Sequence, residues 1–249
     1  MELRGAVAVV TGGGSGLGWF IVERLVAEGC TVLVADVEPG ASAAREEDSR
    51  VAFVRCDVRV AADVERLVGF AVSSFGRLDV VVNNAGGLSR GAQWPDASPS
   101  EWGATLDLNL RGPMLLTQLA LEPMRARGGG VVVNVASSAG LGWEPYDSPE
   151  YGAAKAGLIR FTASVAGLGA SIGVRVNCIV PHWIGLERAY AERAAMSAAE
   201  RAAAGAFVEP EAVADCVVWL AQDESLCGAV VEMPGGSERR LLGTRDAER

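Results

Sequence analysis

The sequence predicts an α/β protein in which a doubly wound parallel sheet of seven strands carries helices on both faces. Short β-type segments alternate with helical segments along the chain, which implies right-handed crossovers between parallel strands. Most of the strand segments are continuous apolar runs, as expected for strands covered on both faces. Hydrophobic types make up 50% of the 249 residues, which is enough for a full core.

Each element has its own signal in the sequence. The first helix follows a glycine-rich turn, the second is amphipathic, and the fourth begins with Ser148 as N-cap and Pro149 as its first residue. The last helical segment is rich in alanine, and no linker or internal repeat divides the chain, so one domain is expected over residues 1–249, with a charged tail at 237–249. Strands are expected at residues 7–11, 31–36, 51–56, 78–83, 131–136, 174–180 and 228–233, and helices at 16–28, 61–75, 99–125, 149–168 and 187–205.

The composition excludes several classes of protein. Asp and Glu number 31 against 22 Lys and Arg, a net charge of -9 that argues against nucleic-acid or anionic-membrane partners. No apolar run reaches the roughly 20 residues of a membrane span, and the N-terminus lacks the pattern of a signal peptide. With one histidine and five widely spaced cysteines, neither a metal site nor a disulfide framework is expected. The cysteines are interpreted as core residues of a cytoplasmic protein.

A glycine-rich turn follows the first strand. It reads TGGGSGLG over residues 11–18 and fits the spacing T-G-x-x-x-G-x-G. Such glycines let the backbone approach a pyrophosphate, which then rests on the N-terminus of the next helix. The alternative is an ordinary strand–helix turn, which the neighbouring strand and helix make a weaker interpretation. The residues expected to contact the cofactor here are Gly12, Ser15, Gly16, Leu17 and Gly18.

The end of the second strand predicts which dinucleotide binds. Asp36 can accept hydrogen bonds from both hydroxyls of the adenosine ribose and would repel a 2′-phosphate. Val37 follows it, and Ser15 rather than an arginine precedes Gly16, so NAD is expected rather than NADP. The alternative is that Asp36 is a surface carboxylate at a strand end.

Tyr151 and Lys155 are four residues apart, so on a helix they share one face. Lys155 is the single lysine of the chain. A tyrosine with a pKa of about 10 needs a large downward shift for acid–base work near pH 7. The lysine ammonium, the helix N-terminus and an oxidised nicotinamide are a plausible source of that shift. Taken alone, the spacing is also that of a common surface pair.

In combination, the motifs resemble those of the short-chain dehydrogenase/reductase family, and the resemblance covers nearly the whole chain. They occur in the family's order: residues 11–18, Asp36, Asp57-Val58, Asn83-Asn84-Ala85-Gly86, Asn109, Ser137, Tyr151-x-x-x-Lys155 and Asn177 to Pro181. The resemblance implies that the protein moves a hydride between a nicotinamide and a secondary alcohol or ketone.

The resemblance also implies roles for single residues. Tyr151 is the general acid/base, Lys155 lowers its pKa and binds the nicotinamide ribose, and Asn109 holds a water that links Lys155 to solvent. The serine that polarises the carbonyl is Ser137 by its spacing from Asn134 and Gly140, or Ser138 by the count back from Tyr151; Ser137 is preferred. Further cofactor contacts are implied for Asp57, Val58, Asn84, Ala85, Gly86, Pro181 and Ile184.

Departures from the family pattern lie on the nicotinamide side, where His182 replaces the usual glycine and Leu186 a common threonine. His182 either touches substrate or fills space in its loop. Three tryptophans fall in segments that line the substrate cleft of this family and suit a bulky, partly apolar substrate: Trp94, Trp143 and Trp183. Their alternative is to pack the loops. The loop also carries Tyr146 and three acidic residues, Glu144, Asp147 and Glu150. The acidic residues would disfavour acyl-phosphate or carboxylate substrates if they faced the pocket; the alternative is that they face water.

Two other functions are compatible with these motifs. One is a reductase of a carrier-bound or biosynthetic intermediate, and the other is a dinucleotide sensor without catalytic activity. The intact Tyr151, Lys155 and Asn109 argue against the sensor. The segment 186–205 is expected to be a lid over the substrate or, alternatively, a surface helix or a subunit contact. Family resemblance further implies a homotetramer or homodimer, with the helices at 99–125 and 149–168 at one interface.

Overall fold

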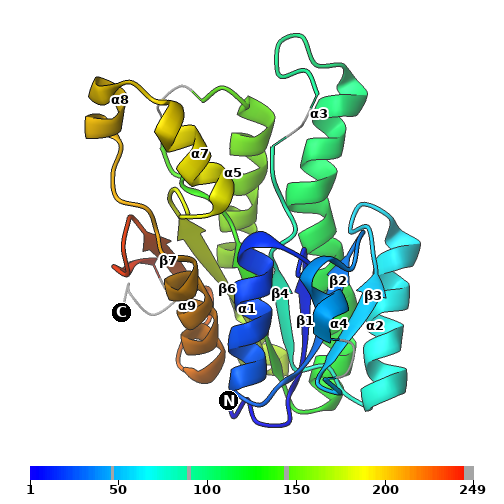
Figure 1. Cartoon of the computed structure of the whole chain (residues 1–249). Helices are drawn as coiled ribbons and strands as arrows, with labels where there is room; N and C mark the ends of the chain where they lie inside the picture. The colour runs from blue at the N-terminus through cyan, green and yellow to red at the C-terminus, as the bar shows by residue number, and fades with distance from the viewer. Residues whose placement is uncertain (46–47, 89–90, 143–145, 244–249) are drawn as a thin grey trace.

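The computed structural model describes residues 1–45, 48–88, 91–142 and 146–243 (Figure 1). One sheet holds eight strands in the order β3-β2-β1-β4-β5-β6-β7-β8, and the first seven run parallel, which confirms the predicted fold class. The strands are β1 Val7–Thr11, β2 Thr31–Asp36, β3 Val51–Arg55, β4 Val80–Asn83, β5 Gly130–Val135, β6 Val174–Pro181, β7 Val230–Met233 and β8 Arg240–Gly243.

Helices cover both faces of this sheet (Figure 1). Because neighbouring residues of a strand point to opposite faces, each central strand contributes to two cores. Ala8 and Val32 pack with helices α1 and α9, whereas Val9 and Leu33 pack with α2 and α4. This explains why the strands read as continuous apolar runs. The helices are α1 Gly16–Ala27, η1 Gly40–Arg45, α2 Ala61–Phe75, α3 Pro99–Leu106, η2 Asp107–Arg111, α4 Gly112–Ala126, η3 Ser138–Gly140, α5 Pro149–Ser164, α6 Gly167–Ile172, α7 Glu187–Ala195, α8 Ala198–Ala203 and α9 Pro210–Gln222.

The eighth strand was not predicted, because it lies within the segment expected to be a charged tail. Strand β8 pairs antiparallel with β7 at the edge of the sheet. Its apolar part is only Leu241 and Leu242, which are 51% and 48% exposed. An edge strand needs backbone pairing on one side and little burial, so its sequence signal is weak.

The long helix expected at 99–125 is divided by a π-helical turn, η2. Pro113 follows this turn and has no amide to donate to the carbonyl four residues earlier, which favours a local widening of the helix. Asn109 lies within the widened turn and is fully buried. The expected helices at 149–168 and 187–205 are likewise divided in two, and a capping box at Ser197 starts the second part of the latter.

All five cysteines are free and four of them are buried, as expected for core residues. Burial raises the pKa of the thiols of Cys30, Cys56, Cys178 and Cys216 to about 12, which keeps them unreactive. Within the described ranges, the helices are all too short or too polar to cross a bilayer. That the chain forms one domain stays a prediction.

Candidate functional site

A cavity of about 880 Å³ lies at the carboxyl ends of the parallel strands, where the strand order reverses between β1 and β4. Ligands of doubly wound sheets bind in this kind of crevice. The structure therefore brings together, around one cavity, most of the residues singled out by sequence. These are Gly12, Ser15, Gly16, Leu17, Gly18, Asp36, Val37, Asp57, Val58, Asn84, Ala85, Gly86, Ser137, Tyr151, Lys155, Pro181, Trp183 and Ile184.

The glycine-rich turn between β1 and α1 is folded tightly on itself. A Cβ atom on Gly18 would lie 2.0 Å from the carbonyl oxygen of Gly12, and Gly12 has a φ of +63°. The first turn of α1 contains no acidic residue, and Ser15 at the N-cap makes no side-chain capping bond. The helix N-terminus is thus open to an anion, so this turn fits the pyrophosphate of a dinucleotide.

Thr11 and Asn84 fix the position of this turn. The amide nitrogen Nδ2 of Asn84 donates to the carbonyls of Thr11 at 2.9 Å and Gly12 at 3.1 Å. The Thr11 hydroxyl accepts from the backbone amides of Asn84 and Ala85, both at 3.0 Å. Sequence reasoning assigned no separate role to Thr11, for which the available signal is a buried threonine at a strand end.

Asp36 ends β2 and faces the same turn. Its carboxylate accepts from the backbone amide of Gly14 at 3.0 Å and from that of Val37 at 2.7 Å. Asp57, further along the cavity, is paired with Arg59 at 2.6 Å, and this guanidinium holds the pKa of the Asp57 carboxyl below its usual range. Asp36 is therefore the acidic group held beside the glycine turn itself.

Tyr151 and Lys155 lie one turn apart on α5 and both line the cavity. The Lys155 ammonium lies 5.6 Å from the centre of the Tyr151 ring and donates to the Val135 carbonyl at 2.9 Å. Lys155 is 3% exposed, and this burial lowers its pKa to about 8.

The pKa of Tyr151 differs in direction from the expectation. Burial raises it, and hydrogen bonding to Ser137 lowers it by a smaller amount. In the protein alone, burial thus outweighs the hydrogen bond to Ser137, and the charge of Tyr146 adds to the increase. The lowering expected from the sequence is not seen in the protein alone, where no nicotinamide is bound.

Asn109 lies behind the cavity wall and does not contribute to its lining. Its Nδ2 donates to the carbonyls of Gly87 and Thr105, both at 2.9 Å, and its Oδ1 accepts from the Gly87 amide at 3.0 Å. Gly86 separates it from Lys155: a Cβ on Gly86 would lie 2.7 Å from Asn109 Oδ1 and 3.1 Å from Lys155 Nζ. Asn109 therefore fixes the loop next to Lys155.

The N-terminus of α5 differs from the prediction in one detail. Ser148 is at the N-cap and Pro149 is the first helical residue, but Ser148 makes no capping bond. Its hydroxyl instead donates to Glu150 Oε1 at 2.8 Å. Glu150 is 7% exposed, does not line the cavity, and its second oxygen Oε2 has no hydrogen-bond partner.

The three tryptophans have different positions. Trp183 lines the cavity and packs edge-on against Phe207, with ring centres 4.8 Å apart. Trp94 does not line it and is 58% exposed, because the loop before α3 projects beyond the sheet (Figure 1). That Trp94 contacts substrate stays a prediction. Trp143 lies outside the described residues.

The two acidic residues of this region that the structure describes, Asp147 and Glu150, do not line the cavity. Asp147 is exposed and outside the cavity lining, Glu144 lies outside the described residues, and Tyr146 does line the cavity. Tyr146 stacks on Tyr151 with ring centres 6.2 Å apart. Sequence spacing placed these residues near the cleft but could not give the direction of their side chains.

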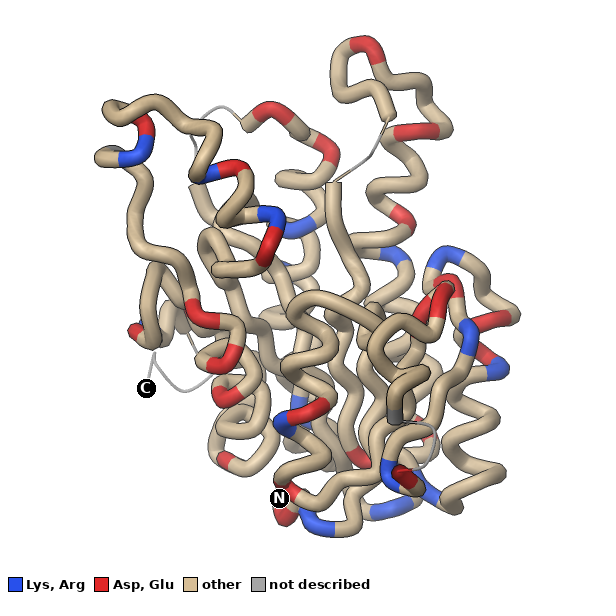
Figure 2. The backbone as a smooth tube through the Cα atoms, in the orientation of Figure 1, with Lys and Arg blue, Asp and Glu red and all other residues tan. Residues whose placement is uncertain are grey.

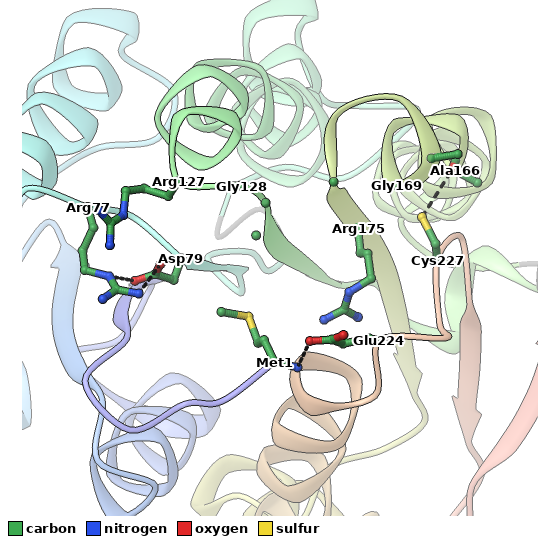
Figure 3. A pocket seen from close by; sticks show the side chains of 14 residues that line it. Met1, Arg77, Asp79, Arg127, Gly128, Ala166, Gly169, Arg175, Glu224 and Cys227 are labelled. Atoms are coloured by element: carbon green, nitrogen blue, oxygen red, sulfur yellow. Dashed lines mark hydrogen bonds and ion pairs between the residues drawn. The ribbon is translucent and has the colours of Figure 1, made fainter.

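A second cavity of about 690 Å³ lies at the opposite end of the sheet (Figure 3). Most of its charged groups are used in internal contacts. Arg77 pairs with Asp79 at 2.6 Å, and Arg175 donates to the four carbonyls of Leu220, Ala221, Asp223 and Leu226 near the end of α9. These contacts tie strands to helices, so the cavity at the carboxyl ends remains the candidate site.

The fold and this site define a dinucleotide-binding α/β oxidoreductase, and comparison with known proteins agrees. The short chain dehydrogenase family matches residues 6–196. Cis-4-hydroxycyclohexanecarboxylate dehydrogenase of Sinomonas cyclohexanicum is 35% identical over 92% of this chain and 95% of its own length. A 3-oxoacyl-(acyl-carrier-protein) reductase of Thermotoga maritima is 33% identical over 95% of this chain and 99% of its own.

Among solved structures, a short-chain dehydrogenase/reductase from Burkholderia xenovorans superposes with a TM-score of 0.83 at 32% identity, covering 94% of this chain and 96% of that one. The chain belongs to the short-chain dehydrogenase/reductase family. It is therefore an oxidoreductase that acts on alcohol or ketone substrates with a nicotinamide dinucleotide.

Proposed function

We propose that the protein is an NAD-dependent dehydrogenase or reductase of a bulky, partly apolar secondary alcohol or ketone. The observation that supports this most is the shared cavity, which is lined by Tyr151, Lys155 and Ser137 and also by the glycine turn and Asp36. Trp183 adds an apolar surface at the substrate end. We also propose that the protein acts in the cytoplasm.

In this proposal the residues of the protein bind and orient the substrate and the cofactor, and they transfer a proton. The nicotinamide, when bound, supplies or accepts the hydride. Tyr151 exchanges a proton with the substrate oxygen, and Lys155 stabilises the tyrosinate through its charge. Ser137 donates a hydrogen bond to the substrate oxygen as charge develops there. Ser137 is preferred over Ser138 because its hydroxyl interacts with Tyr151.

The residues proposed to contact the cofactor form two groups, one around the adenosine and pyrophosphate and one around the nicotinamide. The pyrophosphate rests on the turn of Gly12 to Gly18, and Asp36 accepts from the adenosine ribose. Asp57 and Val58 contact the adenine. The nicotinamide side is formed by Asn84, Ala85, Gly86, Pro181 and Ile184, with Lys155 on the ribose.

Activity with NAD is expected to exceed activity with NADP by about a hundredfold in kcat/KM, because a 2′-phosphate would face the Asp36 carboxylate. The measurement is absorbance at 340 nm with each cofactor over a panel of aliphatic, aromatic and steroid-like alcohols. Asp36→Ala should reduce this preference at least tenfold. Glu38→Ala removes an exposed carboxylate outside the cavity lining and should leave the preference unchanged. A preference for NADP in the unaltered protein would contradict the assignment of Asp36.

Two alternatives have less support. The relative from Thermotoga maritima is named as a reductase of carrier-bound substrates, but Arg188 at the cavity is paired with Glu192 at 2.6 Å rather than available to an acidic carrier. A sensor without catalytic activity has no need of Tyr151 and Lys155 in this arrangement.

The distribution of charge bears on the first alternative, the binding of an acidic carrier. Charged residues of both signs are interspersed along the described chain, as along α2 (Figure 2).

We propose that a second copy of the chain covers an apolar groove on α4 and α5. The groove has a volume of about 530 Å³, and its lining is mostly hydrophobic. Met114 at its edge is 41% exposed. The lining consists of Ala61, Leu106, Leu110, Arg111, Met114, Leu115, Thr117, Gln118, Leu121, Phe161, Val165 and Leu168.

Met114→Glu is expected to dissociate the oligomer, because each copy would bring an unpaired carboxylate into the apolar interface. Light scattering coupled to gel filtration should show a fall from a multiple of the chain mass to the mass of one chain. Val72→Glu on α2 is the matched control, since Val72 is equally exposed at 41% but lies outside the groove. A monomeric unaltered protein would contradict this proposal.

A further inference from the structure

His182 and Glu232 form a hydrogen-bonded pair at the cavity. Glu232 lies beside Val180 in the β6–β7 register, and His182 follows two residues after Val180, so the two side chains meet. His182 Nε2 is 2.7 Å from Glu232 Oε1. The His182 side chain is 37% exposed and lines the cavity with Tyr151 and Trp183, whereas the Glu232 side chain is 17% exposed and lies behind it.

The pair determines what the imidazole can offer to a substrate. A neutral imidazole has one N–H donor and one acceptor nitrogen. Because Glu232 is an acceptor, Nε2 carries the hydrogen, and Nδ1 is the nitrogen that remains for another group. Nδ1 makes no hydrogen bond to any of the described residues.

The charge of the pair favours a neutral partner over an anionic one. A neutral ring with the carboxylate has a charge of −1, and an imidazolium with the carboxylate has a charge of zero. The nearby Arg188 is already paired with Glu192. His182 and Glu232 therefore do not form a cationic site of the kind that holds a substrate carboxylate, whereas a hydroxyl can donate to Nδ1 at no charge cost.

We propose that His182, held by Glu232, is a specificity-determining residue that accepts a hydrogen bond from a second hydroxyl of the substrate. The preferred substrate is then a diol whose carbon skeleton packs on Trp183, rather than a simple alcohol or a hydroxy acid. This inference rests on the proposed dehydrogenase function. Glu232 acts through His182 and is a positioning residue.

The test compares kcat/KM with NAD for cyclohexanol, 1,4-cyclohexanediol and 4-hydroxycyclohexanecarboxylate. The unaltered protein should favour the diol over cyclohexanol by about tenfold, the effect of one hydrogen bond. His182→Ala should remove this preference for the diol by raising the KM for the diol, because the hydrogen bond from the second hydroxyl to His182 forms before the chemical step.

The positioning role of Glu232 has its own test. Glu232→Gln keeps a carbonyl oxygen that accepts from Nε2, so it should retain most of the diol preference, whereas Glu232→Ala should lose it. Glu65→Gln is the matched control, because Glu65 is exposed on α2 and lies outside the cavity lining. Its diol ratio should equal that of the unaltered protein.

Failure of this inference can be told apart from failure of the proposed function. Turnover of the alcohols with no diol preference, a preference for the hydroxy acid, or an unchanged ratio in His182→Ala would overturn the inference alone. Absence of turnover with every alcohol of this set and of the wider panel would overturn the proposed function, and this inference with it.

Discussion

Tyr151→Phe is expected to lower kcat by about a thousandfold while dinucleotide binding is retained. The phenylalanine keeps the ring that packs over Lys155 but removes the only atom of this side chain that can exchange a proton with the substrate. General acid–base catalysis contributes about 10²- to 10⁴-fold, and the lost hydroxyl carries that contribution here. Turnover is measured at 340 nm, and binding by titration of NADH fluorescence.

Tyr146 provides a matched control for this prediction. It is a second phenol in the cavity wall and stacks on Tyr151, but it lies on the loop before α5 rather than one turn from Lys155. Tyr146→Phe should keep most of the activity. If Tyr146→Phe removed turnover and Tyr151→Phe did not, the acid–base role would belong to Tyr146, and its assignment to Tyr151 would be wrong. If neither variant changed turnover, the proposed chemistry would be wrong.

Much of the fold was predictable because burial on both faces leaves a clear pattern. Strands such as β1 and β2 each contain four consecutive apolar residues, and that pattern can be recognised without knowledge of the neighbouring elements. Strand β8 lacked such a pattern, since pairing along one edge demands little of its side chains. The π turn at Asn109 depends on how the chain accommodates Pro113, which helical periodicity alone does not reveal.

The site was predictable where the backbone determines the position of the side chain. Tyr151 and Lys155 are fixed relative to one another by the geometry of one helix, and Asp36 by the end of a strand. Side chains on loops were less predictable. The position of Trp94 depends on the path of the loop before α3, and the pair of His182 with Glu232 joins residues from two different strand ends, 50 positions apart in sequence.

Lys155→Met is expected to remove activity and, at the same time, to stabilise the cofactor-free protein at pH 7 by about 2 kcal/mol. Burial lowers the pKa of Lys155 from 10.5 to about 8, so keeping its charge inside the folded protein costs about 3 kcal/mol near neutral pH. The methionine removes that cost. It also removes the hydrogen bond to Val135, which offsets about 1 kcal/mol of the gain.

The pH dependence distinguishes this electrostatic cost from a simple packing effect. Below about pH 8 both the folded and the unfolded protein hold the Lys155 proton, and the full cost is present. Between about pH 8 and 10.5 the folded protein releases the proton while the unfolded chain keeps it, so the stability of the unaltered protein rises with pH relative to Lys155→Met. The two are compared by urea unfolding at pH 7 and 9.5, which cancels the titration of groups that both proteins share. Two results would show that Lys155 is not held at a cost to the fold. One is a difference in free energy of unfolding between the two proteins that does not shrink at the higher pH. The other is a Lys155→Met variant that is less stable than the unaltered protein at pH 7. The expected result would mean that this charge is kept for catalysis, since the fold itself would be more stable without it.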